Sequence, residues 1–188
     1  MQKTAVESEP FIQRHSGFIQ VVAEKIRLEH EAARLFMRLY QRRFGVSMRH
    51  IWHNEPAKPD VSCYLEQQRL DLEIAHLYGS EAEAMLLLGR ELSPQTRDAL
   101  TALQQVPVQE RMLAALDRLI RQKAHKRYDS ERVWLVIRNT HPVWHPEQLQ
   151  PFRQSINLPQ AQPFEQIWLV TDYRGEHGIA AVYPPELA

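Results

Sequence analysis

Two short, continuous apolar runs constrain the fold of this chain most strongly. They occupy residues 133–137 (VWLVI) and 167–170 (IWLV). Runs of this length, rich in β-branched and aromatic residues, are typical of strands that are buried on both faces. Such strands occur where helices cover a sheet, and the length of 188 residues suits one compact domain. The sequence therefore predicts an α/β fold built on a mixed sheet with helical cover.

The first half of the chain supplies a helix and three shorter strands. Residues 1–16 are polar, and we expect a flexible segment there, which leaves 17–188 as a single domain. Apolar residues at helical spacing predict a helix from about residue 17 to residue 43. In the next segment, Met48, His50 and Trp52 alternate as in a strand. The three strands that we predict here lie at 46–54, 60–65 and 70–77.

The second half adds helices between and after the apolar runs. Ser93 and Pro94 are a helix cap and a first-turn residue, and an apolar stripe marks residues 108–128 as a strong amphipathic helix. The further elements are helical regions at 80–90 and 146–156 and an edge strand at 179–183. The predicted order is therefore helix, three-strand meander, helices, strand, helix, strand.

Composition excludes several classes of protein. The 23 basic and 23 acidic residues balance, so the whole chain carries no positive field for nucleic acid. Cys63 is the only cysteine, which excludes a disulfide framework and a cysteine zinc cage. Glycine-rich nucleotide loops and the GxSxG hydrolase motif are missing. No apolar run approaches a membrane span and no signal peptide is visible, so we expect a cytoplasmic protein without membrane contact.

Two carboxylates stand where adjacent strands would bring them together. Asp60 opens the second predicted strand, and Glu73 lies in the middle of the third. On antiparallel neighbours both side chains can reach one edge of the sheet, and carboxylate oxygens are ligands that suit Mg²⁺ or Mn²⁺. The alternatives are that Asp60 only caps a turn and that Glu73 belongs to a solvated sheet face.

These carboxylates and the element order resemble the PD-(D/E)XK nuclease superfamily, which has the restriction-endonuclease-like fold. The resemblance covers roughly residues 17–172, and it includes the proline before Asp60. It implies that Asp60 and Glu73 bind the metal, Mg²⁺ or Mn²⁺, with help from the carbonyl oxygen of Ile74. The family's lysine, two residues after the glutamate, is replaced here by Ala75.

A lysine elsewhere in the chain could replace the missing one. Lys123 falls on the apolar stripe of the 108–128 helix, beside Leu119 and Ile120. We therefore predict that Lys123 points inward and lies near Glu73, as the third catalytic residue. Lys126 is the second choice. His76 is adjacent to the expected lysine position, but strand alternation turns it to the opposite face.

Further residues could assist the site. Some relatives carry an additional acid on the first helix, where this chain has Glu29 and Glu31, and the sequence does not choose between them. Arg38, Arg42 and Arg127 lie in basic bands that could contact phosphates, although a solvated charged face explains such bands equally well.

Two hypotheses remain from the sequence. The first is a metal-dependent endonuclease that hydrolyses phosphodiester bonds with Asp60, Glu73 and Lys123. The second is a catalytically degenerate protein of the same fold that acts as a nucleic-acid-binding or protein-interaction module, which Ala75 and the zero net charge favour. Whether the chain is an enzyme, its substrate and its oligomeric state stay open.

Overall fold

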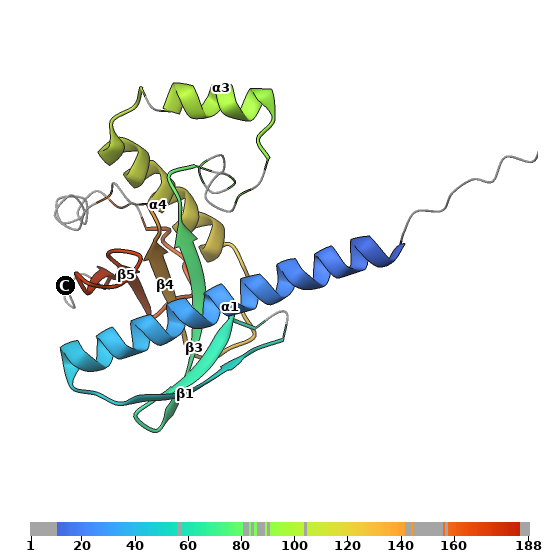
Figure 1. Cartoon of the computed structure of the whole chain (residues 1–188). Coiled ribbons are helices and arrows are strands. Elements are labelled where there is room, and N and C mark those ends of the chain that lie inside the picture. Colours follow the sequence, from blue (N-terminus) through green and yellow to red (C-terminus); the bar gives the residue numbers. More distant parts are fainter. Residues whose placement is uncertain are drawn as a thin grey trace, which may run out of the picture.

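A computed structural model gives the arrangement of most of the chain. It describes residues 11–55, 58–80, 83, 85, 89, 91–103, 105–141, 144, 156 and 158–184. Within these ranges the protein is a mixed α/β structure with one six-stranded sheet and three helices of ten residues or more. Figure 1 shows α1 and α4 on opposite sides of the sheet. The α/β class predicted from the two apolar runs is confirmed.

The sheet follows chain order from β1 to β6. β1, β2 and β3 form an antiparallel meander, β4 is parallel to both β3 and β5, and β6 returns antiparallel to β5. The meander and the two strands beside it are therefore as predicted. The strand bounds are β1 Met48–His53, β2 Val61–Leu65, β3 Gln68–Leu77, β4 Val133–Asn139, β5 Gln166–Val170 and β6 Ile179–Tyr183.

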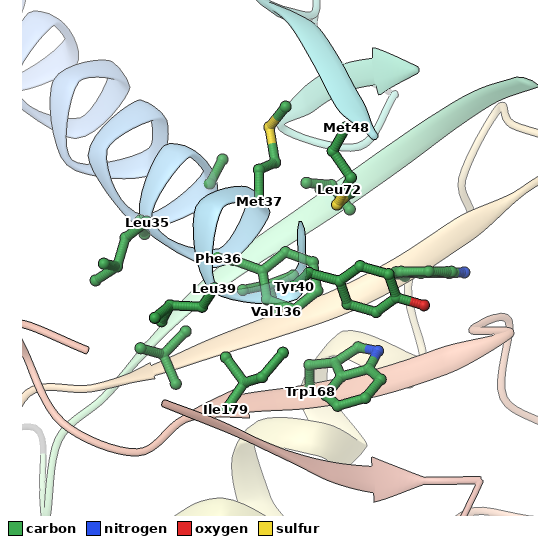
Figure 2. Packing of buried hydrophobic residues seen from close by; sticks show 14 of the residues in the cluster. Leu35, Phe36, Met37, Leu39, Tyr40, Met48, Leu72, Val136, Trp168 and Ile179 are labelled. Carbon is green, nitrogen blue, oxygen red and sulfur yellow. The ribbon is translucent and has the colours of Figure 1, made fainter. Parts of the chain in front are cut away.

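Helix α1 (Phe11–Phe44) covers one face of the sheet. Its apolar stripe packs on the even-numbered residues of β3 and on inward residues of the neighbouring strands. Phe36 is fully buried, and its ring lies 6.1 Å from Trp168 and 6.4 Å from Trp134, measured between ring centroids. Figure 2 shows Phe36 and Tyr40 of α1 against Val136 and Trp168 of the sheet.

Helix α4 (Val108–Ala124) covers the opposite face. Its buried residues Met112, Leu116 and Ile120 pack on alternate residues of β4 and β5 and on the end of β3. Among the described elements, the apolar cluster beneath α4 includes no residue of β1 or β2. A third helix, α3 (Pro94–Leu103), lies away from the sheet (Figure 1).

Several predicted boundaries need correction. α1 begins at Phe11, six residues before the predicted start, because a single glycine at position 17 costs only about 1 kcal/mol in a helix. α4 ends at Ala124 rather than at residue 128, since Tyr128 folds back and donates a hydrogen bond to the carbonyl of Lys123. The predicted helix at 146–156 and most of the one at 80–90 lie outside the described residues.

The alternation predicted for the first strand is also wrong. Met48 packs in the core under α1, whereas Trp52 lies on the other face of the sheet. A break in the β1–β2 register lies between Arg49 and Trp52, and His50 has a φ of 54°, in the left-handed region. This bulge inserts an extra residue, which reverses the face of every side chain after it.

Candidate functional site

The candidate site lies where β2 begins late against β3. The β2–β3 pairing stops at Val61 opposite Leu72, so no described strand pairs with residues 73–77 of β3 on that side. The N–H and C=O of one residue in a strand point to the same edge. At Ile74 both groups find other partners: the N–H donates to Asp60 Oδ2 over 2.8 Å, and the carbonyl accepts from Lys123 Nζ over 3.0 Å.

Glu73 is buried next to this edge and is held by two lysines. Its side chain is 3% exposed, and Oε1 lies 2.6 Å from Lys123 Nζ and 3.2 Å from Lys126 Nζ. Lys123 is 15% exposed, whereas Lys126 is 52% exposed, so the first contact is the buried one. The contact that the sequence predicted between Lys123 and Glu73 is present. It pairs a desolvated carboxylate with the cation that such a group requires.

Helix geometry explains how Lys123 reaches the sheet edge. It lies three residues after the buried Ile120 and seven after the buried Leu116, on the stripe that faces the sheet. Tyr128 fixes the end of the helix, because its hydroxyl donates to the carbonyl of Lys123 over 3.0 Å. Burial raises the pKa of Tyr128, and the nearby charge of Glu73 raises it further. Tyr128 follows the helix in a loop, and no pattern in the sequence predicts its place at the site.

Of the two acids on α1, Glu29 belongs to the site and Glu31 does not. Glu29 is buried, and its carboxylate lies 3.4 Å from Lys25 Nζ. Burial raises the pKa of Glu29 to about 7, and the negative charge of Asp60 adds to this, against the opposing effect of Lys25. Glu31 is exposed and pairs with Arg27 over 2.6 Å.

Asp60 completes the acidic group. Burial raises the pKa of Asp60, and the charge of Glu73 raises it further, while Lys123 acts in the opposite direction. Lys25, which the sequence analysis did not select, is held by its i,i+4 contact with Glu29. Burial lowers the pKa of Lys25, but the charges of Glu29, Asp60 and Glu73 and the hydrogen bond to Glu29 together outweigh it, and the pKa is raised. Three carboxylates thus influence one another and are balanced by lysines from α1 and α4.

A cavity of about 320 Å³ opens beside these groups, between α1, the end of β3 and α4. Its lining includes Lys25, Glu29, Ala75, His76 and Lys123. Burial lowers the pKa of His76 to about 4, with Arg138 and Lys123 adding to the effect, so the imidazole is neutral at pH 7. Its Nε2 is buried and has no hydrogen-bond partner among the described residues. His76 therefore lies at the cavity, although its strand position placed it on the other face.

The donor atoms fit a hard divalent cation in part. Asp60, Glu73 and the Ile74 carbonyl supply oxygen donors, which Mg²⁺ and Mn²⁺ prefer. Lys123 already binds Glu73 Oε1 and the Ile74 carbonyl, so two of these oxygens converge on one positive charge. Across the described ranges, no three His, Cys, Asp or Glu side chains are arranged to hold a metal. A metal here would rest on two carboxylates, one main-chain carbonyl and water.

The neighbouring acid of β3 belongs to a different network. Asp71 is buried and accepts hydrogen bonds from Ser62 and Ser130, and Arg69 Nε lies 3.0 Å from its Oδ1. The three arginines predicted to contact phosphate are exposed and do not contact the carboxylates of the site; they are Arg38, Arg42 and Arg127.

The fold and the site define a mixed α/β protein that carries a buried carboxylate–lysine centre at a sheet edge. Comparisons with protein-family models, with curated proteins and with solved structures found no match for the chain. In the part of the chain that the structure describes, no helix has the length and apolar character needed to cross a membrane.

Proposed function

We propose that this protein is a metal-dependent phosphodiester hydrolase acting on nucleic acid, with a restriction-endonuclease-like fold and a PD-(D/E)XK-type site whose lysine has moved to a helix. One observation carries the proposal. The ammonium group of Lys123 contacts both Glu73 Oε1 and the carbonyl of Ile74. The ammonium group thus lies on the side of β3 where a lysine side chain at position 75 would lie.

The chain's own groups have distinct tasks in this proposal. Asp60, Glu73 and the Ile74 carbonyl hold the metal ion, which supplies charge stabilisation and an acidified water when bound. Lys123 neutralises the phosphate and orients the attacking water. The oxygen of that water bonds to phosphorus and releases a proton to solvent, the ester P–O bond breaks, and the leaving oxygen takes up a proton from solvent. Glu29 supports the site from α1 by holding Lys25.

Titration calorimetry with Mn²⁺ on the whole chain tests the metal site. We expect binding by the wild type and none by Asp60→Ala or Glu73→Ala, because one remaining carboxylate and a neutral main-chain carbonyl cannot hold a hydrated divalent ion tightly. Glu31→Gln is the matched control, since it removes an exposed acid of α1 outside the site. Absence of binding by the wild type at millimolar Mn²⁺ would refute the metal-dependent hydrolase.

One observation favours the second candidate, a degenerate module that binds nucleic acid or protein without catalysis. The Glu73 carboxylate is already neutralised by two lysines, and Asp60 accepts the Ile74 N–H, so the centre is electrostatically satisfied by the chain alone. Binding of an oligonucleotide in EDTA, without cleavage when Mn²⁺ is added, would support this candidate over the hydrolase.

A further inference from the structure

The outer face of the β1–β3 meander carries an aromatic and basic surface on which Trp52 is half-buried and the other side chains are exposed. It is made by Arg49, Trp52, Tyr64 and Arg69, which we call the platform. Arg49 pairs with Tyr64 across β1 and β2, and Tyr64 pairs with Arg69 across β2 and β3, so the three side chains form one row on one face. Tyr64 is 38% exposed and the Arg69 side chain 47% exposed.

The β1 bulge brings Trp52 onto this face. Trp52 comes three residues after Arg49, and regular alternation would turn it to the α1 side. The bulge with His50 at a φ of 54° adds the extra residue, and Trp52 pairs with Ser62 in the row next to Tyr64. A left-handed conformation at a non-glycine residue costs about 1–2 kcal/mol. Such strain is typical of positions where a strand re-aims a side chain for function.

The platform's rings and cations lie together. The Trp52 and Tyr64 ring centroids are 5.6 Å apart, and the Arg69 guanidinium lies 5.8 Å from the Trp52 ring centre. Arg69 is held there by Asp71, whose carboxylate is buried and also accepts hydrogen bonds from two serines. The platform thus presents two rings, the positive charge of Arg49, and the guanidinium of Arg69, whose charge Asp71 offsets in part. Rings beside a cation complement a polyanion with flat bases.

The platform is continuous with the proposed catalytic site. Arg69, Asp71 and Glu73 lie on the same face of β3, and Glu73 is two residues, about 7 Å, beyond the row that contains Trp52. A groove of about 850 Å³ is lined by Arg69 of the platform and by Tyr128, whose hydroxyl contacts the Lys123 carbonyl. Among its described lining residues are no other platform residue and neither Glu73 nor Lys123. Among the described elements, the apolar cluster under α4 includes no residue of β1 or β2, so Arg49 and Tyr64 are exposed on this face, whereas Ser62 and Asp71 in the Trp52 row are buried.

We propose that the platform binds single-stranded nucleic acid by base stacking and leads the strand into the Glu73–Lys123 site. This proposal rests on the proposed hydrolase function and specifies its substrate class. Single-stranded bases expose their faces to aromatic rings, whereas the bases of a duplex cover one another. The groove lining combines Lys58, Arg69 and Arg132 with Asp71, Asp129 and Glu131. Stacking, rather than phosphate charge, therefore supplies most of the affinity.

Fluorescence anisotropy in EDTA separates this binding from catalysis. The probes are a labelled 20-nucleotide single strand, as DNA and as RNA, and a DNA duplex of the same sequence. We expect the single strands to bind at least tenfold more tightly than the duplex. Trp52→Ala should weaken single-strand binding about tenfold, as loss of one stacking ring does. Trp52→Phe should stay near the wild type. Tyr173→Ala, which removes a 47%-exposed ring elsewhere, is the control.

Intrinsic fluorescence gives a second measurement that a purely structural role would not change. Trp134, Trp144 and Trp168 are buried, so Trp52 is the one of the four tryptophans that a base can reach. Adding unlabelled single strand should quench the wild type, and Trp52→Phe should bind without this quenching.

Each outcome bears on one proposal or the other. Equal affinity for duplex and single strand, or an effect of Tyr173→Ala as large as that of Trp52→Ala, would overturn the platform. A wild type that binds none of the three probes would overturn the platform as well. Normal single-strand binding without cleavage in Mn²⁺ would refute the hydrolase and leave the platform intact. If the wild type cleaves the strand and Trp52→Ala cleaves it equally fast, the platform would be refuted and the hydrolase would stand.

Discussion

The ion pair between Lys123 and Glu73 should make a large and specific contribution to stability. Lys123→Met keeps the apolar stem and removes the charge. It leaves a carboxylate that is 3% exposed without its closest partner, 2.6 Å away. Removing one member of a buried pair costs about 3–5 kcal/mol. Lys126 remains 3.2 Å from the same oxygen, but because its side chain is 52% exposed it reduces this cost by only about 1 kcal/mol. We therefore expect a loss of about 2–4 kcal/mol in the free energy of unfolding.

A double-mutant cycle measured by urea unfolding isolates this pair. The variants are Lys123→Met, Glu73→Gln and the double variant, and we expect a coupling energy of about 2 kcal/mol with an unchanged dependence on urea. Lys126→Met is the matched control on the same carboxylate and should cost less than about 1 kcal/mol. A coupling energy near zero, or equal losses for the two lysine variants, would refute the electrostatic argument.

The same variant tests the catalytic assignment. A loss of this size leaves a domain of ordinary stability folded, so Lys123→Met should remain folded and lose Mn²⁺-dependent cleavage of an oligonucleotide. Folded protein that still cleaves would show that Lys123 is not the replacement for the motif lysine, and Lys126 and His76 would then be tested.

Two further predictions concern pH and the core. Burial and Asp60 raise the pKa of Glu29 from 4.5 to about 7, so the metal-free folded state holds an extra proton between these values. The free energy of unfolding should fall as pH rises from about 4.5 to about 7, by no more than about 1.4 kcal/mol per pH unit. Urea titrations at several pH values should show a weaker dependence of this free energy on pH for Glu29→Gln than for the wild type. An identical dependence on pH would contradict this. Phe36→Ala should cost about 3–5 kcal/mol in urea unfolding because the ring is fully buried against Tyr40 and Trp168, and a loss below about 1 kcal/mol would contradict the packing.

The sequence predicted those features that depend on periodicity. The continuous apolar runs identified the central strands β4 and β5, and the wheel position of Lys123 predicted its contact with Glu73. The sequence pattern could not predict the bulge at His50, because one extra residue in a strand does not change the composition. That residue nevertheless reverses the face on which Trp52 lies. The chemical roles of these residues stay predictions.

The choice between the two acids of α1 could have been made from the sequence. Glu29 lies three, four and seven residues before Ala32, Ala33 and Phe36, all of which are buried, so it continues the stripe that faces the sheet. Glu31 lies two residues further along and turns outward. By contrast, Tyr128 lies in a loop after the helix, where no periodicity applies, and only the fold brings its hydroxyl back to Lys123.

Ala75, which stands where the motif that the sequence resembles has a lysine, is accommodated by the packing of α4. Ala75 is 4% exposed and belongs to the apolar cluster beneath that helix. Ala75 also lines the cavity that Lys123 lines, so a lysine at position 75 would compete with Lys123 for the same space, and overpacking a core costs about 1–3 kcal/mol. The small side chain lets the helix come close, and this closeness brings Lys123 to Glu73 and Ile74. In the proposed site, the alanine on the strand and the lysine on the helix are therefore compatible parts of one packing arrangement, and Ala75 is no evidence by itself against the proposed hydrolase.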